Sequence, residues 1–133
     1  RFKQVRERES QVSTRFAENV LDATNAFALY IDDASALAGV PEDALQMLSE
    51  SAQADGKTGY KISLQYPSYS SIVDYAHDRT LRQQVYRAYS TRAPEFGDPD
   101  WNNGPLMVEL LKLRREHAQL LGYNSFAEVS LVA

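Results

Sequence analysis

The sequence has no cysteine among its 133 residues. Disulfide bonds, thiolate nucleophiles and cysteine-based metal sites are therefore excluded, and a reducing compartment fits, so we expect a cytoplasmic protein. No apolar run approaches the ~20 residues that a membrane-spanning helix needs, and no signal-peptide pattern is visible. We therefore expect no membrane partner.

Charge of neither sign dominates the chain. Fourteen Lys and Arg residues stand against 18 Asp and Glu residues, which gives a net charge of −4. Nucleic-acid binding needs a concentrated basic surface, so we expect no nucleic-acid partner. We interpret the recurring basic residues as solvated helix faces; these are Arg79, Arg82, Arg87, Arg92, Lys112, Arg114 and Arg115.

Hydrophobic periodicity predicts a mainly α protein with one small antiparallel β-hairpin. Period-2 alternation from Tyr60 to Tyr66 predicts a strand over residues 59–67 that ends at Pro67. Its expected partner is a short strand at 26–31, with a helix inserted between the two strands. Helical patterns cover residues 1–26, 39–56, 69–76, 81–89 and 106–121, and a last helix begins at Asn124 or Ser125. With no internal repeat and no linker, residues 1–133 are expected to form a single unit.

Residue types at the predicted helix ends suggest how the helices begin and stop. Pro41 suits the first turn of the 39–56 helix, and Gly56 suits its end. Thr80 and Gln83 have the spacing of a capping box. Asn102 or Asn103 is expected to cap the next helix, with Pro105 in its first turn and Gly122 after its last residue.

His117, next to Glu116, is the first candidate for metal chemistry. A zinc-binding helix needs two ligands on one face, four residues apart, and Leu113 and Leu121 occupy those positions. Glu116 lies about 100° around the helix from His117. The pattern therefore predicts a hydrogen-bonded histidine on the stripe of Leu106, Leu110, Leu113, His117 and Leu121.

A second candidate is a calcium-binding loop at residues 98–109. Asp98, Asp100, Asn102 and Glu109 occupy positions 1, 3, 5 and 12 of an EF-hand loop. Position 6, which needs glycine, holds Asn103, and Pro105 lacks the N–H that position 8 would donate. We therefore expect no calcium site.

Three further groups favour structural roles. The eight tyrosines suit the edge of a core, where their hydroxyls find partners. Serines 68, 70 and 71 lack a partnered histidine, because no spacing links them to His77. Asp32 and Asp33 are interpreted as turn residues. We expect no catalytic, cofactor-binding or metal-binding residue in this chain.

The order of these segments resembles a known family. The stretches are "FAENVLDATNAFALYIDDASALAGVPEDAL", "GYKISLQYPSYSSIVDYAHDRTLRQQVYRAYSTRA" and "LRREHAQLLGYNSFAEVSL". Together they are similar to the thimet oligopeptidase and neurolysin family of zinc metallopeptidases, over essentially the whole chain. "RAYSTRA" (87–93) and "LRREHAQLLGY" (113–123) carry most of this resemblance.

The resemblance implies a segment upstream of the catalytic region. In this family two histidines and a glutamate of an H-E-x-x-H helix, with a further glutamate, form the zinc site, and this chain contains no such motif. The implied fold is the helical, zincin-type fold of neurolysin, in which an N-terminal region forms one wall of a substrate channel. The implied partners are short peptides and the catalytic half of the same polypeptide.

We therefore expect a fragment of a zinc metallo-oligopeptidase that is inactive alone, lacks the catalytic zinc domain and binds no zinc itself. The chain starts inside a helical pattern and stops at "SLVA", which also suggests a segment of a longer protein. Such a fragment should expose an apolar surface and self-associate. The alternative is a free-standing helical module that binds a protein or peptide without chemistry.

Overall fold

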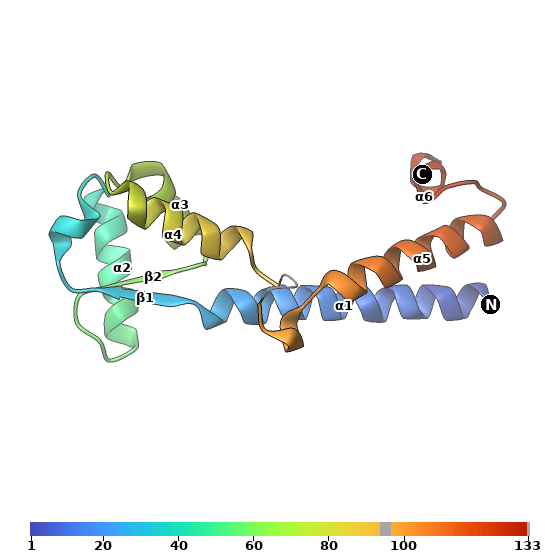
Figure 1. The fold of residues 1–133 in the computed structure, drawn as a ribbon, viewed down its shortest axis with the longest axis horizontal. Helices are drawn as coiled ribbons and strands as arrows, with labels where there is room; N and C mark the ends of the chain where they lie inside the picture. Colours follow the sequence, from blue (N-terminus) through green and yellow to red (C-terminus); the bar gives the residue numbers. More distant parts are fainter. Residues whose placement is uncertain (94–96, 133) are drawn as a thin grey trace. The chain divides into compact units, whose positions relative to one another are not determined.

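The computed structural model describes residues 1–93 and 97–132 of the chain. These residues are mainly helical with one two-stranded sheet, as the sequence predicts (Figure 1). None of the helices in this part of the chain is both long and apolar enough to cross a membrane. In chain order the elements are α1 (Phe2–Ala26), β1 (Ala28–Ile31), the 3-10 helix η1 (Ala34–Leu37), α2 (Glu42–Ala54), β2 (Tyr60–Ser63), α3 (Tyr66–Tyr75), α4 (Arg79–Ser90), the 3-10 helix η2 (Pro99–Trp101), α5 (Gly104–Leu120) and α6 (Phe126–Leu131).

The chain divides into two compact units. Unit 1 combines Arg1–Leu21 with Ala93–Ala133, and unit 2 is Asp22–Arg92. Unit 1 therefore contains most of α1 together with α5 and α6, and unit 2 contains the hairpin with α2, α3 and α4.

In unit 1 the helices α1 and α5 run antiparallel. Contacts move toward the start of α5 as the chain proceeds along α1. Arg1 Nε, just before α1, lies 2.7 Å from Glu116 Oε1, and Arg8 Nε lies 2.6 Å from Glu109 Oε1. Apolar side chains are buried in the same unit, among them Val5, Val12 and Ala118. Val5 and Val12 therefore lie on the buried side of α1, together with the polar residues Glu9 and Asn19.

In unit 2 the two strands pair as the alternation predicts. They are antiparallel, with Ala28 opposite Ser63 and Ile31 opposite Tyr60, and α2 is inserted between them in the sequence. Two strands alone are marginally stable, so the helices must supply the core. That core consists of Leu37, Val40, Leu48, Ile62, Ile72, Ala76, Leu81 and Val85.

The second strand is shorter than the sequence predicts. Pairing stops at Ser63 because its partner Ala28 is the first residue of β1. Leu64 keeps its predicted burial, but Tyr66 is 67% exposed and already begins α3. The sequence predicts that Pro67 ends the strand, and it lies instead in the first turn of α3, where its missing N–H leaves no helical hydrogen bond unmade.

The helix-end predictions have mixed outcomes. Asp78, and not Thr80, caps α4, and its carboxylate accepts hydrogen bonds from the backbone of Thr80 and Leu81. An aspartate side chain at the N-cap accepts hydrogen bonds from the free backbone N–H groups of the first turn. Asp78 therefore takes the place of the predicted capping box. Ser125 caps α6 as predicted, since its Oγ accepts from the backbone of Glu128.

At α5 the predicted cap is divided between two asparagines. Asn103 occupies the cap position, whereas the side chain of Asn102 accepts the hydrogen bond from Gly104 N at 2.9 Å. Leu121 is 46% exposed, so its predicted place on the buried stripe is wrong. It is the last residue before Gly122, whose φ of +85° turns the chain out of the helix.

Candidate functional site

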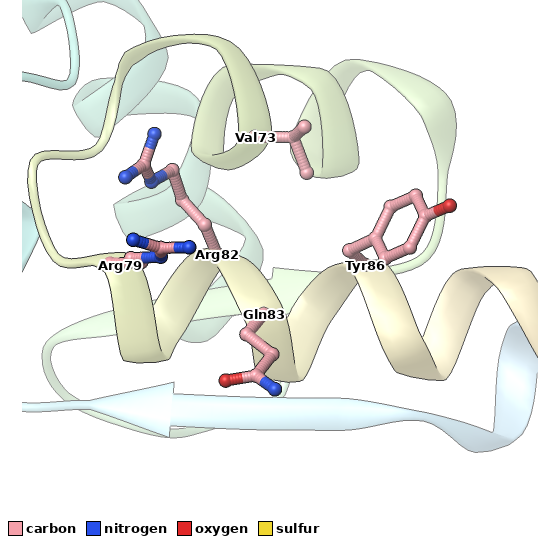
Figure 2. A pocket seen from close by; sticks show the side chains of 5 residues that line it. All are labelled: Val73, Arg79, Arg82, Gln83 and Tyr86. Carbon is pink, nitrogen blue, oxygen red and sulfur yellow. The ribbon is translucent and has the colours of Figure 1, made fainter.

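A hollow of unit 2 lies between α3 and α4. It is a pocket of about 580 Å³ lined by Val73, Arg79, Arg82, Gln83 and Tyr86 (Figure 2). Val73 comes from α3, and the other four residues come from one stretch of α4. In the view of Figure 2 the two arginine side chains lie at one end of the pocket and Tyr86 at the other.

The packing of α3 against α4 positions this pocket. Ile72 in α3 and Leu81 and Val85 in α4 are buried in the shared core. In an α-helix the residue that follows each of these three buried residues lies about 100° around the helix axis, on a neighbouring face. Val73, Arg82 and Tyr86 each follow one of the three anchors, so the core packing turns all of them toward the same side.

The pocket carries positive charge that no acidic residue of its lining balances. The nearby Asp78 carboxylate is occupied at the start of α4, where it accepts from Thr80 N and Leu81 N. The Nε atom of Arg82 is buried and has no hydrogen-bond acceptor within the described residues. A buried donor without a partner is costly, so the free energy of this arginine is not balanced by its protein contacts alone.

The arginines between residues 79 and 92 do not all form a solvated face, which differs from the interpretation of the sequence. Arg82 is half-buried, and Arg92 stacks on the ring of Tyr89 with its guanidinium carbon 3.7 Å from the ring centroid. Arg92 also donates to Thr24 Oγ1 at 3.0 Å. Periodicity alone could not distinguish these arginines from the exposed Arg87.

His117 lies in a second cluster, in unit 1. It is 4% exposed, and its Nδ1 lies 3.0 Å from Glu9 Oε1 and 3.1 Å from Glu9 Oε2. Its ring makes edge-to-face contacts with Phe2 and Phe126, at centroid distances of 5.2 and 5.4 Å. The predicted hydrogen-bonded histidine is therefore confirmed, and its partner Glu9 is a residue that the sequence reading did not identify.

This cluster does not fit a zinc ion. Glu116 turns away from the histidine to bind Arg1, as the helical angle predicts. Among residues 1–93 and 97–132, no group of three His, Asp or Glu side chains could hold a metal. One carboxylate and one ring nitrogen packed between two phenylalanines offer no complete ligand set.

The residues of the calcium-like loop make other contacts. Asp98 accepts from Asp100 N at the start of η2, and Asn102 accepts from Gly104 N. Glu109, which would be the bidentate ligand, binds Arg8, and this guanidinium lowers the pKa of Glu109. Residues 94–96, which precede the loop, lie outside the described residues.

The remaining candidates take structural roles. Asp33 caps η1 by accepting from Ser35 N, and these hydrogen bonds lower its pKa. Ser68 is buried and accepts from Ser63 N at 2.9 Å, while Ser71 donates to the backbone of Ser68. The side chains of these serines are therefore engaged with the backbone next to β2.

Tyrosine hydroxyls and rings are used at the edge of the core. Tyr30 donates to Asp55 Oδ2 at 2.7 Å, and Tyr69 stacks on Tyr89 with centroids 3.9 Å apart. Burial raises the pKa of Tyr69. Tyr86 is 57% exposed and lines the pocket between α3 and α4, so its ring is available to a ligand there.

The comparisons with known proteins agree with the family resemblance. Residues 72–133 match the model of Peptidase family M3. The chain is therefore similar to the peptidases of that family, and the resemblance to the thimet oligopeptidase and neurolysin family is confirmed.

Oligopeptidases A are among the individual proteins that it resembles. It is 43% identical to oligopeptidase A of Haemophilus influenzae, 41% to that of Salmonella typhimurium and 40% to that of Escherichia coli, each over 98% of this chain. The chain spans about a fifth of the length of these relatives, 20% in each case.

Proposed function

We propose that this chain is a segment of a cytoplasmic zinc endopeptidase of the oligopeptidase A type, which hydrolyses internal bonds of short peptides. The segment itself supplies no catalytic residue. It forms part of the wall of the substrate channel and packs against the catalytic part of the same polypeptide, where the zinc is held.

One observation carries this proposal. The chain matches oligopeptidase A over 98% of its own length but only 20% of the relative's length, and its 133 residues contain no H-E-x-x-H sequence. A segment with these properties has the ancestry of a peptidase without the ligand set of the family. A structural role within the larger enzyme follows most directly.

Exposed apolar side chains in unit 1 support a packed partner. On α5, Met107 and Val108 are about half exposed and Leu111 is 67% exposed, and in α6 Leu131 is 84% exposed. Met107 and Leu111 are four residues apart and therefore share a helix face. Large apolar side chains gathered on one face mark a surface that another protein segment covers.

The first experiment compares the whole protein with the chain. The full-length protein should cleave a quenched fluorescent peptide, lose that activity with a chelator and regain it with zinc. The purified 133-residue chain should cleave nothing. Chelator-sensitive cleavage by the chain alone would contradict the structural role, and a full-length reading frame without H-E-x-x-H would favour the free-standing interaction module.

The second experiment tests the packing surface. The chain and the remainder of the protein, expressed separately and mixed, should reconstitute peptidase activity. Leu111→Asp should weaken this reconstitution, because it places a charge in the apolar contact. Gln119→Asp, at an exposed polar position of the same helix, is the control and should reconstitute as well as the unchanged chain. Equal behaviour of the two variants would contradict the assignment of this face.

A further inference from the structure

We propose that the pocket between α3 and α4 binds the C-terminal carboxylate of a short peptide, with Arg79 and Arg82 as its cationic partners. This inference rests on the proposed function, which makes peptides the ligand class. It adds a carboxylate-binding site to a segment for which we propose no catalytic residue.

The first argument is the unbalanced charge. Arg79 and Arg82 are three residues apart on α4, so their side chains leave neighbouring positions of one helix face. Neither makes an ion pair with an acid in the described part of the chain, and the lining contains no carboxylate. Two like charges repel each other, and an anion between them removes that repulsion.

The second argument is the donor geometry of Arg82. Its Nε is buried and has no acceptor within the described residues, so the terminal nitrogens of this half-buried side chain are the donors that a ligand can reach. The planar guanidinium holds its donors in a fixed fork, which matches the two oxygens of a carboxylate.

The third argument is the size and composition of the rest of the pocket. Its volume of about 580 Å³ lies within the ~300–1,000 Å³ that small-molecule sites occupy, and it exceeds the needs of a single carboxyl group. Val73 and the exposed ring of Tyr86 offer an apolar surface, and the Gln83 amide can donate and accept. A terminal residue with an apolar side chain and a peptide bond therefore matches the lining better than a free anion does.

The test is a calorimetric titration of the purified chain with N-acetyl-alanyl-phenylalanine, which ends in a free carboxylate. We expect saturable binding, and we expect the C-terminal amide of the same peptide to bind at least about tenfold more weakly, because the amide cannot pair with the two guanidinium groups. Arg79→Met and Arg82→Met should each weaken binding of the free acid by about tenfold or more.

Arg87→Met is the matched control, because Arg87 lies on the same helix and does not line the pocket. It should bind the free acid as the unchanged chain does. Arg79 is exposed, so the Arg79→Met variant is expected to fold even if Arg82→Met does not. Circular dichroism of each variant verifies this.

Absence of saturable binding, equal binding of acid and amide, or equal effects of Arg79→Met and Arg87→Met would each overturn the inference. The titration needs no metal and no catalysis, so its outcome is separate from the test of the proposed function. If the full-length protein cleaves peptides but the pocket binds none, the inference about the pocket is wrong and the proposed function stands. Carboxylate-dependent binding without metal-dependent cleavage would leave the pocket and remove the peptidase assignment.

Discussion

Replacing His117 with alanine tests whether the buried cluster of unit 1 stabilises the fold. The side chain is 4% exposed, contacts Glu9 through Nδ1 and packs against two phenylalanine rings. The substitution removes all three contacts and leaves the Glu9 carboxylate, whose residue is 8% exposed, with the Arg6 guanidinium at 3.8 Å as its remaining ion-pair partner.

The expected loss in the free energy of unfolding is about 3–5 kcal/mol. A buried hydrogen bond to a charged group contributes ~1.5–3 kcal/mol, and each aromatic contact adds ~0.5–1.5 kcal/mol. Such a loss is a large part of the ~5–15 kcal/mol that stabilises a typical domain.

Urea unfolding measures this loss. The single tryptophan, Trp101, lies in unit 1, so its fluorescence reports on the same unit as His117. Glu116→Ala is the control: its side chain binds Arg1 at the surface, where water can replace the contact, so a much smaller effect is expected.

A double variant separates pairing from packing. Glu9→Leu with His117→Phe replaces the polar pair by apolar side chains, and it should recover most of the stability that His117→Ala loses. A loss of under ~1 kcal/mol for His117→Ala, or one no larger than for Glu116→Ala, would refute the reasoning.

Two further predictions concern unit 2. Gly39 has φ +94°, and a Cβ there would collide with the backbone oxygen of Tyr75, so Gly39→Ala should lower the free energy of unfolding by more than ~2 kcal/mol. Gly56 has φ +70° and open space around it, so Gly56→Ala should cost only ~1 kcal/mol of backbone strain. Equal melting temperatures of the two variants would contradict this reasoning. Hydrogen bonding to Lys61 lowers the pKa of Asp55, so the stabilisation is present above the ordinary aspartate pKa and is lost as pH falls through the lower folded value. Lys61→Met should therefore flatten the decline in urea midpoint below about pH 4, and an unchanged decline would exclude this ion pair as its source.

The helical pattern and the hairpin could be predicted from the sequence because they depend on local periodicity. The strand at Tyr60–Ser63 follows from alternation, and its partner at Ala28–Ile31 follows from bulky apolar residues at the point where helical periodicity ends. The end of the second strand could not be predicted in the same way. It depends on where its partner begins, and alternation in one segment does not contain that information.

Contacts between residues that are far apart in the sequence could not be predicted from it. Glu9 resembles the other charged residues of α1, and only the position of α5 reveals that it faces His117, 108 residues away. The pocket shows the same limit, since the sequence identifies Arg79 and Arg82 as basic helix residues. Their accessibility depends on how α3 packs against α4, which tertiary structure determines.

The family resemblance predicted more than the residue patterns did. It was carried by long phrases such as residues 113–123, whose Glu116 and His117 have roles in packing and pairing. Family ancestry can therefore be recognised in a segment that holds none of the family's metal ligands.

Asn103 determines the register between two helices of unit 1. Its side-chain oxygen accepts from Asn19 at 2.9 Å, its amide donates to the backbone oxygen of Phe16 at 3.1 Å, and its own N–H donates to Ala93 O. Apolar helix faces tolerate sliding, because leucine and valine side chains can exchange neighbours. A shift of α5 along α1 by one turn, ~5.4 Å, would break both amide contacts inside a site that is 1% exposed. Asn103 therefore makes the alignment of α1 with α5 discrete, so that neighbouring alignments are separated by the loss of two buried hydrogen bonds.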